Sequence, residues 1–519
     1  MRLRALVFTL LVPGLVAATS RDDERFRFMD VFELEWASDP QIAPDGDRIV
    51  YVRNFMDITS DVRRSNLWIV NADGTDHRPL TTGNRNDSSP RWSPDGARLA
   101  YVSSTDGTPQ LYVRWMDTGI TAQVTHLTSA PSGLAFSPDG SRLAFSMLVP
   151  KEPEPFARLP QKPDGAQWAA PPRMIEKLQY RSDGQGYLKD GYYHLFVVPS
   201  DGGTPTQLTD GDFNHPGPPA WTPDGRALVF SANRHDDWEY DPLDTELYEV
   251  SVDERTITAL TDRKGPDASP AVSPDGTRIA FVGFDDHYQG YEVSKLYVLN
   301  RDGGEPSVLT AELDRAAGAP RWNADSDGVY FQYDDEGATT VALVPLDGEV
   351  QSLSARVGGT SLGRPYSSGS FSVARDGRVA LTYSRPDRPA DVAVVSEAGA
   401  SRTLTDLNGD LLGHKELGSV ETLWYTSEHD GRRVQGWVVK PPGFDPSRKY
   451  PLILEIHGGP FASYGEHFAA EVQLYAAAGY VVLYTNPRGS TSYGREFGNL
   501  IHHAYPGNDY DDLMSGVDA

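Results

Sequence analysis

Cysteine is the residue that this sequence lacks altogether, with none in 519 residues. A chain without thiols forms no disulfide bond, and it offers neither a cysteine nucleophile nor a thiolate ligand for a metal ion. The absence fits an exported protein that uses no disulfides.

Basic residues are scarce relative to acidic ones. Lysine and arginine number 47 against 73 aspartates and glutamates, which gives a net charge of -26 at pH 7 and an isoelectric point of about 4.8. Nucleic-acid binding requires a basic face, so no nucleic-acid partner is expected. The acidic surface mainly indicates solubility, and attraction of cationic peptides is the weaker alternative.

Long apolar runs are missing after the first 20 residues. Residues 1–20 carry Arg2 and Arg4, then an apolar run from Ala5 to Ala18 that is too short to span a bilayer. This pattern predicts a secretory signal peptide cleaved near Ala18, and an uncleaved anchor is the alternative. We therefore expect an exported chain, periplasmic or extracellular, without membrane contact after cleavage.

Glycine and proline are abundant, at 49 and 39 residues, while the mean hydropathy is -0.46. Hydrophobic residues at 39% and aromatic residues at 10% suffice for packed cores. This balance favours a turn-rich fold that is mostly β. A chain of this length also exceeds the usual size of one domain, so at least two are expected.

A repeated unit organises residues 30–407: Pro-Asp-Gly, two further residues and a short apolar strand. Its aspartates, including two in worn copies, lie 50, 44, 85, 51, 50 and 51 residues apart. They are Asp45, Asp95, Asp139, Asp224, Asp275, Asp325 and Asp376. Each copy reads as four strands, with the last ending at Leu-Thr, which predicts a seven-bladed β-propeller. A β-sandwich is the rival, but it would not repeat so evenly, and the Asp-Gly pairs are predicted to be structural turns, not calcium loops.

The step of 85 residues predicts an insertion in the third blade, at about residues 148–190. Its many prolines prevent it from continuing the sheet. It forms either a surface flap or a wall of a substrate chamber. An acidic cluster at residues 236–246 could bind a cation or a substrate amine, but a solvated loop between strands explains it better. The same holds for His287 beside Asp285 and Asp286, and no metal is assigned.

Beyond residue 411 the pattern changes. Residues 420–426 and 434–440 alternate as an antiparallel hairpin, while residues 451–456 and 481–484 are short apolar runs typical of strands buried on both faces. Phe468, Val472 and Tyr475 recur between these runs at helical spacing, and Gly479 closes the segment. Strand, helix and strand at this length predict a parallel crossover of an α/β sheet.

The first of these strands ends in His457-Gly458-Gly459-Pro460. Two glycines at the carboxyl end of a strand let backbone N–H groups approach a ligand, as in an oxyanion hole, although an ordinary tight loop has the same composition. A helix is predicted to follow Asn508 as its cap, with Leu513, Met514 and Val517 facing inward.

The wider set of motifs resembles the prolyl oligopeptidase family of serine peptidases, in its acylaminoacyl-peptidase and dipeptidyl-peptidase branch. The motifs are His457-Gly458-Gly459-Pro460, Asn486-Pro487-Arg488-Gly489-Ser490, Tyr493-Gly494 and residues 507–513. The resemblance implies a mainly β chain with an α/β part: a seven-bladed β-propeller at 21–410, then an incomplete α/β-hydrolase domain at 411–519. It also implies that the family's catalytic serine, aspartate and histidine lie beyond residue 519.

The resemblance implies roles for few residues. The backbone N–H of Gly459 would supply half of the oxyanion hole, and the other half would follow the serine. Six residues would shape the site without doing chemistry. They are His457, Gly458, Pro460, Asn486, Arg488 and Tyr493. No cofactor is implied.

Other serines could in principle replace the missing nucleophile. The pattern Gly-x-Ser-x-Gly occurs at Ser361, but there it lies in a glycine- and serine-rich link between blades, not between a buried strand and a helix. Ser490 and Ser492 have the wrong spacing for a nucleophile elbow. His502 and His503 are predicted to be surface residues at a helix end.

The sequence therefore predicts a serine peptidase that hydrolyses short peptides by acyl transfer, with this chain inactive on its own. The alternative is a periplasmic propeller that binds a partner without catalysis, like the propeller of the Tol system. The crossover with His457-Gly458-Gly459-Pro460 distinguishes the two, because a binding module has no need of it. Substrate specificity and oligomeric state are not readable.

Overall fold

The computed structural model describes residues 24–105, 107–151, 157, 160–170, 172–359, 361–395 and 401–519. The predicted signal peptide, residues 1–20, lies outside the described residues. No helix in the described part of the chain is long and apolar enough to cross a membrane.

Most of the chain forms groups of four antiparallel strands, of which the last two are joined into one eight-stranded sheet where Val357 of one pairs with Tyr383 of the other. The first group is β1 (Trp36–Ile42), β2 (Arg48–Asp57), β3 (Val62–Asn71) and β4 (Arg78–Pro79). The second is β5 (Asp87–Trp92), β6 (Arg98–Ser103), β7 (Gln110–Trp115) and β8 (Thr121–Gln123). The third is β9 (Pro131–Phe136), β10 (Arg142–Pro150), β13 (Gly191–Pro199) and β14 (Thr206–Gln207).

Four further groups complete the set. The fourth is β15 (Ala220–Trp221), β16 (Ala227–Ala232), β17 (Glu246–Ser251) and β18 (Ile257–Ala259). The fifth is β19 (Asp267–Val272), β20 (Arg278–Gly283), β21 (Lys295–Asn300) and β22 (Ser307–Val308). The sixth is β23 (Gly318–Trp322), β24 (Gly328–Asp335), β25 (Ala338–Pro345) and β26 (Gln351–Val357). The seventh is β27 (Phe371–Val373), β28 (Val379–Arg385), β29 (Arg388–Val395) and β30 (Ser401–Thr403).

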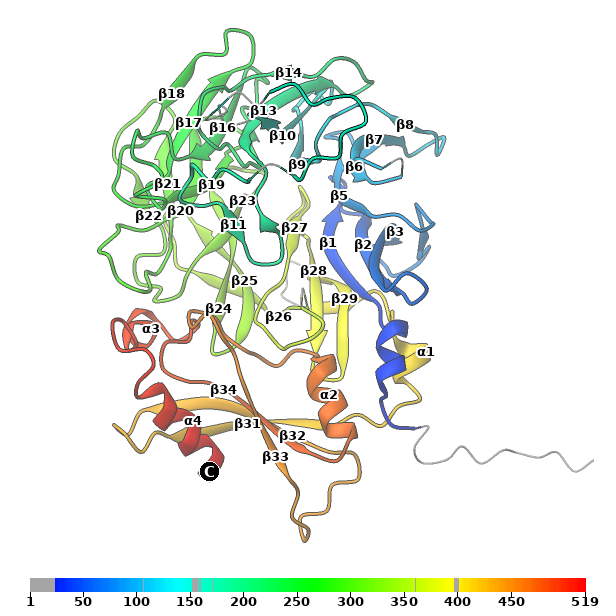
Figure 1. The fold of residues 1–519 in the computed structure, drawn as a ribbon, viewed down its shortest axis with the longest axis vertical. Helices are drawn as coiled ribbons and strands as arrows, with labels where there is room; N and C mark the ends of the chain where they lie inside the picture. Colours follow the sequence, from blue (N-terminus) through cyan, green and yellow to red (C-terminus); the bar gives the residue numbers. More distant parts are fainter. Residues whose placement is uncertain are drawn as a thin grey trace, which may run out of the picture.

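The seven groups are the blades of a propeller, as the repeat predicted. The first strands of neighbouring blades contact one another from β1 through β5, β9, β15 and β19 to β23, and β27 of the last blade packs against β1. Each first strand pairs with its second strand and leaves its other edge toward the axis. Figure 1 shows these first strands gathered around the middle of the propeller.

The predicted turns form because the aspartate side chain satisfies the turn's own donors. Asp95 Oδ1 accepts from the Ser93 hydroxyl at 2.5 Å and from the Ala97 N–H at 3.0 Å. Gly96 takes φ +71°, which only glycine adopts without strain. The same bonds recur at Asp139, Asp224 and Asp275. These carboxylates are structural, as expected.

The Leu-Thr pairs also have a local cause. Thr81 Oγ1 accepts the N–H of Leu67 at 2.8 Å. This hydrogen bond connects the end of the fourth strand to the third strand of the same blade. The equivalent pairs are Thr125 with Leu111, Thr209 with Leu195, Thr261 with Leu247, Thr310 with Leu296 and Thr405 with Val392.

Blades pack face to face, so the apolar cores lie between them. One such core joins Val50 and Leu67 of the first blade to Leu99 and Tyr101 of the second. Tryptophans also connect neighbouring blades by hydrogen bonds. The Trp92 indole N–H donates to the Gln41 carbonyl of the preceding blade at 2.9 Å.

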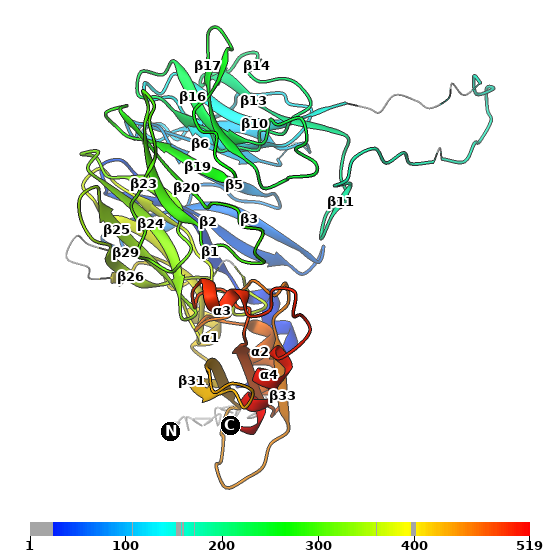
Figure 2. The same cartoon turned by 90° about the vertical axis from the view of Figure 1, so that its left-hand side faces the viewer.

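The insertion leaves the third blade between β10 and β13. Its described part includes a separate two-stranded sheet of β11 (Arg181–Ser182) and β12 (Gly186–Tyr187). In Figure 2 this pair stands away from the blades.

The carboxyl-terminal part holds a mixed sheet in the order β31-β32-β34-β33. Its strands are β31 (Ser419–Thr426), β32 (Arg433–Lys440), β33 (Leu452–Ile456) and β34 (Val481–Asn486). The helices are α1 (Gly409–Leu412), α2 (Ala470–Ala477), α3 (Arg495–Asn499) and α4 (Asp509–Asp518). β33 and β34 are parallel and joined through α2, which confirms the predicted crossover. This sheet lies below the propeller in Figure 1.

Three local expectations for this part were wrong. β34 is buried, but β33 is only half-buried, because it is the edge strand and Leu452 and Ile456 remain exposed. Asn508 does not cap α4 through its side chain, which instead hydrogen-bonds to His429 at 2.9 Å. Met514 is exposed, so the inward face of α4 is Leu513 with partly buried Val517.

The segment before β1 packs on the carboxyl-terminal part. It contains the 3₁₀ helix η1 (Phe28–Glu33), and Phe26 meets Phe468 edge-on with ring centroids 6.3 Å apart. Asp30 and Lys415 form a buried ion pair at 2.8 Å. The segment before β1 is therefore anchored to the carboxyl-terminal part beside the propeller.

Candidate active site

Two loops meet at the carboxyl ends of the parallel strands β33 and β34. The first is His457-Gly458-Gly459-Pro460, and the second runs from Asn486 to Ser490. In α/β sheets, ligands bind outside the carboxyl ends of the strands. This edge of the sheet is therefore the candidate active site, and it faces the propeller.

The glycine pair presents free backbone donors. Gly458 and Gly459 are exposed, and Gly459 takes φ +88°. Among the described residues, neither glycine N–H donates a backbone hydrogen bond, and no atom lies within 4 Å of the position that a Cβ would take. N–H groups left open in this way can donate hydrogen bonds to a ligand oxygen.

His457 and Ser490 make a serine–histidine contact that sequence reasoning did not anticipate. His457 Nε2 lies 2.9 Å from Ser490 Oγ, and both side chains are buried. The Ser490 hydroxyl donates to the Pro487 carbonyl at 2.7 Å, so the histidine N–H is the donor in the contact. A histidine that donates to the hydroxyl cannot take its proton.

No carboxylate of the described part of the chain completes this pair. His457 Nδ1 is buried without a side-chain partner. Burial lowers the pKa of His457, so its ring is neutral at pH 7. The contact therefore connects the two loops instead of forming a nucleophile and base.

Asn486 holds the loop that carries the glycines. Its Oδ1 accepts from the Tyr464 N–H at 2.8 Å, and its Nδ2 donates to the Tyr464 carbonyl at 2.9 Å and to the Tyr493 hydroxyl at 2.8 Å. The Tyr493 hydroxyl donates on to Gln435 at 2.5 Å, and burial raises the pKa of Tyr493. The side chains of Asn486 and Tyr493 therefore fix the backbone of the glycine loop, and neither points toward a ligand.

Arg488 ties the second loop to α4. Its Nε and Nη2 donate to Asp512 at 2.9 and 2.7 Å, and its backbone N–H donates to the same carboxylate at 2.8 Å. Hydrogen bonds to Asp512 raise the pKa of Arg488. Asp430, in the turn between β31 and β32, accepts from the same guanidinium at 3.2 Å.

The remaining serine and histidine candidates lie in contacts between the two parts of the protein. Ser492 Oγ accepts the N–H of Gly337, in the sixth blade, at 2.8 Å. His502 Nδ1 accepts the N–H of Gly290, in the fifth blade, at 2.9 Å, while His503 is exposed.

Ser361 lies in the link between β26 and β27, where a strand and not a helix follows the serine, so no nucleophile elbow forms there. The sequence predicted only a glycine- and serine-rich link between two blades here. It docks on α2, because the Leu362 carbonyl accepts the Ala470 N–H at 2.9 Å.

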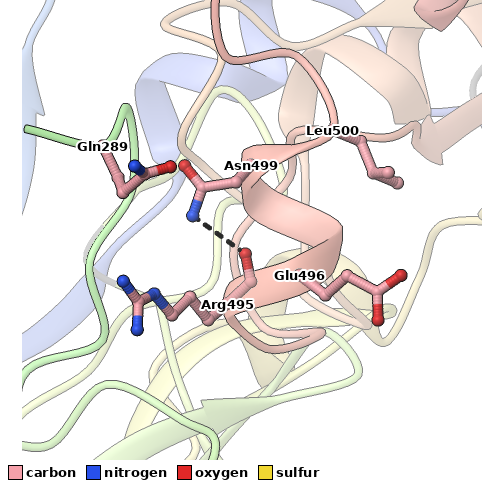
Figure 3. A pocket seen from close by; sticks show the side chains of 5 residues that line it. All are labelled: Gln289, Arg495, Glu496, Asn499 and Leu500. Carbon is pink, nitrogen blue, oxygen red and sulfur yellow. Dashed lines mark hydrogen bonds between the residues drawn. The ribbon is translucent and has the colours of Figure 1, made fainter. Parts of the chain in front are cut away.

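A cavity of about 530 Å³ lies where α3 meets the fifth blade. It is lined by Gln289, Arg495, Glu496, Asn499 and Leu500, and Figure 3 shows Gln289 reaching toward Asn499 across it. Tyr291 stacks on Phe461, two residues after Gly459, with centroids 6.0 Å apart. The cavity is thus close to the glycine loop.

The third-blade insertion encloses a larger cavity of about 1190 Å³. Lys177, Tyr180 and Tyr187 of the insertion face Trp238 and Glu239 of the fourth blade across this space. The nearby acidic cluster is tied into its loops, since Asp241 pairs with Lys264 at 3.3 Å. Among the described residues, no group of three or more His, Cys, Asp or Glu could hold a metal ion.

A seven-bladed propeller followed by a parallel crossover, with open N–H donors at a strand end, defines a propeller-bearing α/β hydrolase. Comparison with known proteins identifies the family. The model of the prolyl oligopeptidase family matches residues 466–519, and that of the dipeptidyl peptidase IV N-terminal region matches residues 182–282. Models of the TolB β-propeller domain and the lipoprotein LpqB β-propeller domain match residues 41–154 and 250–428.

Whole-length relatives agree. YuxL of Bacillus subtilis, an uncharacterized peptidase, is 32% identical over 506 residues, which span 94% of this chain and 75% of that protein. Dipeptidyl-peptidase 5 of Porphyromonas gingivalis is 26% identical over 504 residues, or 93% of this chain and 71% of that protein. Acylaminoacyl peptidase of Pyrococcus horikoshii has the same fold, with a TM-score of 0.76 at 21% identity over 95% of this chain and 72% of that one.

The chain belongs to the prolyl oligopeptidase family, and its relatives are peptidases. The resemblance and the fold class predicted from the sequence are confirmed.

Proposed function

We propose that this chain is part of a serine-type peptidase that hydrolyses short peptides by acyl transfer. The observation that carries the proposal is the exposed glycine pair at the end of β33, whose N–H groups donate no backbone hydrogen bond to any residue that the structure describes. An acyl oxygen that becomes negative in the transition state needs such donors, and the Gly459 N–H would supply one of two.

The nucleophile is proposed to come from outside these 519 residues. Ser490 donates its proton to a carbonyl, Ser492 accepts from the sixth blade, and Ser361 has no elbow around it. The outer edge of β33 is unpaired among the described strands, which leaves room for a further parallel strand. We therefore propose that these 519 residues alone are inactive.

The other residues expected at the site would then act through structure. His457, Asn486 and Arg488 hold the two loops together, Tyr493 supports Asn486, and Gly458 with Pro460 sets the path of the chain beside Gly459.

Short peptides are the proposed substrates, in line with the names of the relatives. We also propose the division into a leader at 1–20, a propeller at 21–410 and a hydrolase part at 411–519. Export to the periplasm or outside the cell is proposed with it. The match to a lipoprotein propeller and the apolar leader both support export. Purified secreted protein that begins at Met1 would contradict cleavage.

The test compares the 519-residue chain with the product of its reading frame continued downstream. Loss of the nucleophile lowers serine-protease turnover by about 10⁶-fold, and one oxyanion donor contributes only about 10²- to 10³-fold. We expect the continued product alone to cleave dipeptidyl and acylaminoacyl amides. Equal turnover by the 519-residue chain would refute the assignment of its serines, and inactivity of both would refute the peptidase.

A further inference from the structure

The first strands of four blades share a bulge that faces the propeller axis. In each, the register shifts around a residue with positive φ followed by proline. The four are Asp39-Pro40-Gln41 (φ 46°), Ser89-Pro90-Arg91 (φ 53°), Ser269-Pro270-Ala271 (φ 55°) and Ala319-Pro320-Arg321 (φ 52°). The register shift is in the pairing with the second strand, and the bulged residues belong to the innermost strand of each blade, so they lie beside the axis.

Between the first two blades, this arrangement makes an ion pair. Arg91 Nη1 donates to Asp39, one blade earlier, at 2.9 and 3.2 Å. Both side chains are partly exposed, at 34% and 31%. The guanidinium also turns back to the carbonyl of its own Pro90 at 2.6 Å.

Arg321 occupies the same bulge position as Arg91 but lacks the carboxylate. It turns back to its own Pro320 carbonyl at 2.8 Å in the same way. One blade earlier, the residue equivalent to Asp39 is Ser269. Among the described residues, no carboxylate lies within ion-pair distance of Arg321.

Arg321 lies on β23, the innermost strand of the sixth blade. Its side chain is exposed to solvent. Even so, burial lowers the pKa of Arg321, the positive charge of Arg91 lowers it further, and Asp39 acts in the opposite direction. A side chain that is reached by water but enclosed by protein has these two properties together.

A cavity of about 320 Å³ opens beside Ser269. The side chains of Gln179, Asn214, Asn233 and Trp238 line it, and Ser269 itself is part of its wall.

We propose that the propeller axis binds an oxyanion of carboxylate type at Arg321, in the place that Asp39 fills for Arg91. A guanidinium recognises carboxylates through paired N–H donors, and such bonds are stronger than neutral ones. The site stands within a chain of net charge -26, so attraction of an anion has to come from this local guanidinium. A peptide's carboxyl terminus and a free small carboxylate share the required chemistry.

The test measures dissociation constants on the full chain by ligand-detected NMR at low ionic strength, with acetate, triglycine and triglycine amide as probes. Arg321→Gln should weaken triglycine binding about tenfold or more, because a hydrogen bond to a charged group is lost. Ser269→Asp should weaken it as much, since the new carboxylate takes the ligand's place. Ser269→Asn has the same size without charge and tolerates positive φ, so it should change the constant less than about twofold.

The probes separate the two sources. Binding of triglycine without binding of acetate or the amide assigns the site to a peptide terminus, and equal binding of triglycine and acetate assigns it to small carboxylates. Absence of binding by both acids overturns the proposal, as does unchanged affinity in Arg321→Gln or in Ser269→Asp. Because turnover is not measured, this result is independent of the proposed peptidase activity.

Discussion

At the scale of single residues, two asparagines do equivalent work on either side of the candidate site. Asn486 accepts from the N–H of Tyr464 and donates to its carbonyl, and Asn499 does the same for Tyr291 at 3.0 and 2.6 Å. A side-chain amide is suited to this because it carries one donor and one acceptor side by side. The first clamp lies within the carboxyl-terminal part, and the second joins that part to the propeller.

Asn486→Ala should destabilise the carboxyl-terminal sheet. The side chain is fully buried, so its removal leaves the N–H and carbonyl of Tyr464 without partners, and each such group costs about 1–3 kcal/mol. We expect the free energy of unfolding in urea to fall by about 2–4 kcal/mol. The exposed Asn508→Ala should change it by less than about 0.5 kcal/mol, and equal effects of the two variants would refute the clamp.

At the scale of elements, one polar side chain of the third strand supports the end of the fourth strand in two of the blades. Gln110 accepts from Thr125 and Leu127 in the second blade, and Asp391 accepts from Thr405 and Leu407 in the seventh. Both bonds to Asp391 use the same oxygen, which leaves the other able to hold a proton. Burial raises the pKa of Asp391 to about 6.

The raised pKa of Asp391 predicts a pH dependence with a definite sign. Between about pH 4 and 6 the folded chain keeps a proton that the unfolded chain has lost. The contribution of Asp391 is therefore complete below about pH 4 and is lost as the pH rises through 6, by at most about 3 kcal/mol.

Asp391→Asn imitates the protonated form, so it should flatten this part of the stability curve and be the more stable protein at pH 7. Urea unfolding of both proteins at pH 4.5 and 7 measures the difference. The exposed Asp387→Asn should leave the slope unchanged. A parallel shift of the wild-type and Asp391→Asn curves would disprove the assigned pKa.

The half-buried edge strand β33 predicts self-association. Leu452 and Ile456 are 43% and 47% exposed on a strand with an unpaired edge, and such edges pair with other chains. We expect sedimentation velocity of the 519-residue chain to show concentration-dependent oligomers, which Leu452→Lys with Ile456→Lys should abolish. Tyr240→Lys removes a more exposed ring, away from any unpaired strand edge of the carboxyl-terminal sheet, and should not abolish the oligomers. A strictly monomeric wild-type chain would contradict this prediction.

At the scale of the whole molecule, one side of the candidate site is built by the propeller. The loop from the fifth blade binds α3 through Tyr291 and Asn499, and the sixth blade binds Ser492. The glycine loop lies next to this seam, because Phe461 stacks on Tyr291. Movement of the propeller therefore changes the surroundings of Gly459.

Asn499→Ala should loosen this seam. Two hydrogen bonds to the backbone of Tyr291 are lost, which we expect to separate the melting of the propeller from that of the carboxyl-terminal part in calorimetry. Glu496→Ala, on the same helix, breaks only a surface ion pair with Arg432 and should leave one combined transition. Identical traces for both variants would show that Asn499 does not couple the two parts.

The sequence predicted the features whose causes are local. The turns at Asp95 and its equivalents satisfy their own donors. The crossover between β33 and β34 shows a local pattern of apolar residues, so both features could be predicted from the sequence. The contacts of Ser492 with Gly337, of Leu362 with Ala470 and of Phe26 with Phe468 join residues far apart in the chain. No neighbouring residue signals such contacts, and the role of Asn486 was hidden for the same reason.

The central claim is that these residues provide the propeller and one oxyanion donor of a serine peptidase without its nucleophile. Labelling with a serine-directed fluorophosphonate, followed by mass spectrometry of the modified peptide, tests it most directly. We predict no labelling of the 519-residue chain and stoichiometric labelling, at a serine after residue 519, of the product of the continued reading frame. Stoichiometric labelling of the 519-residue chain at Ser490, Ser361 or any other serine would contradict the claim.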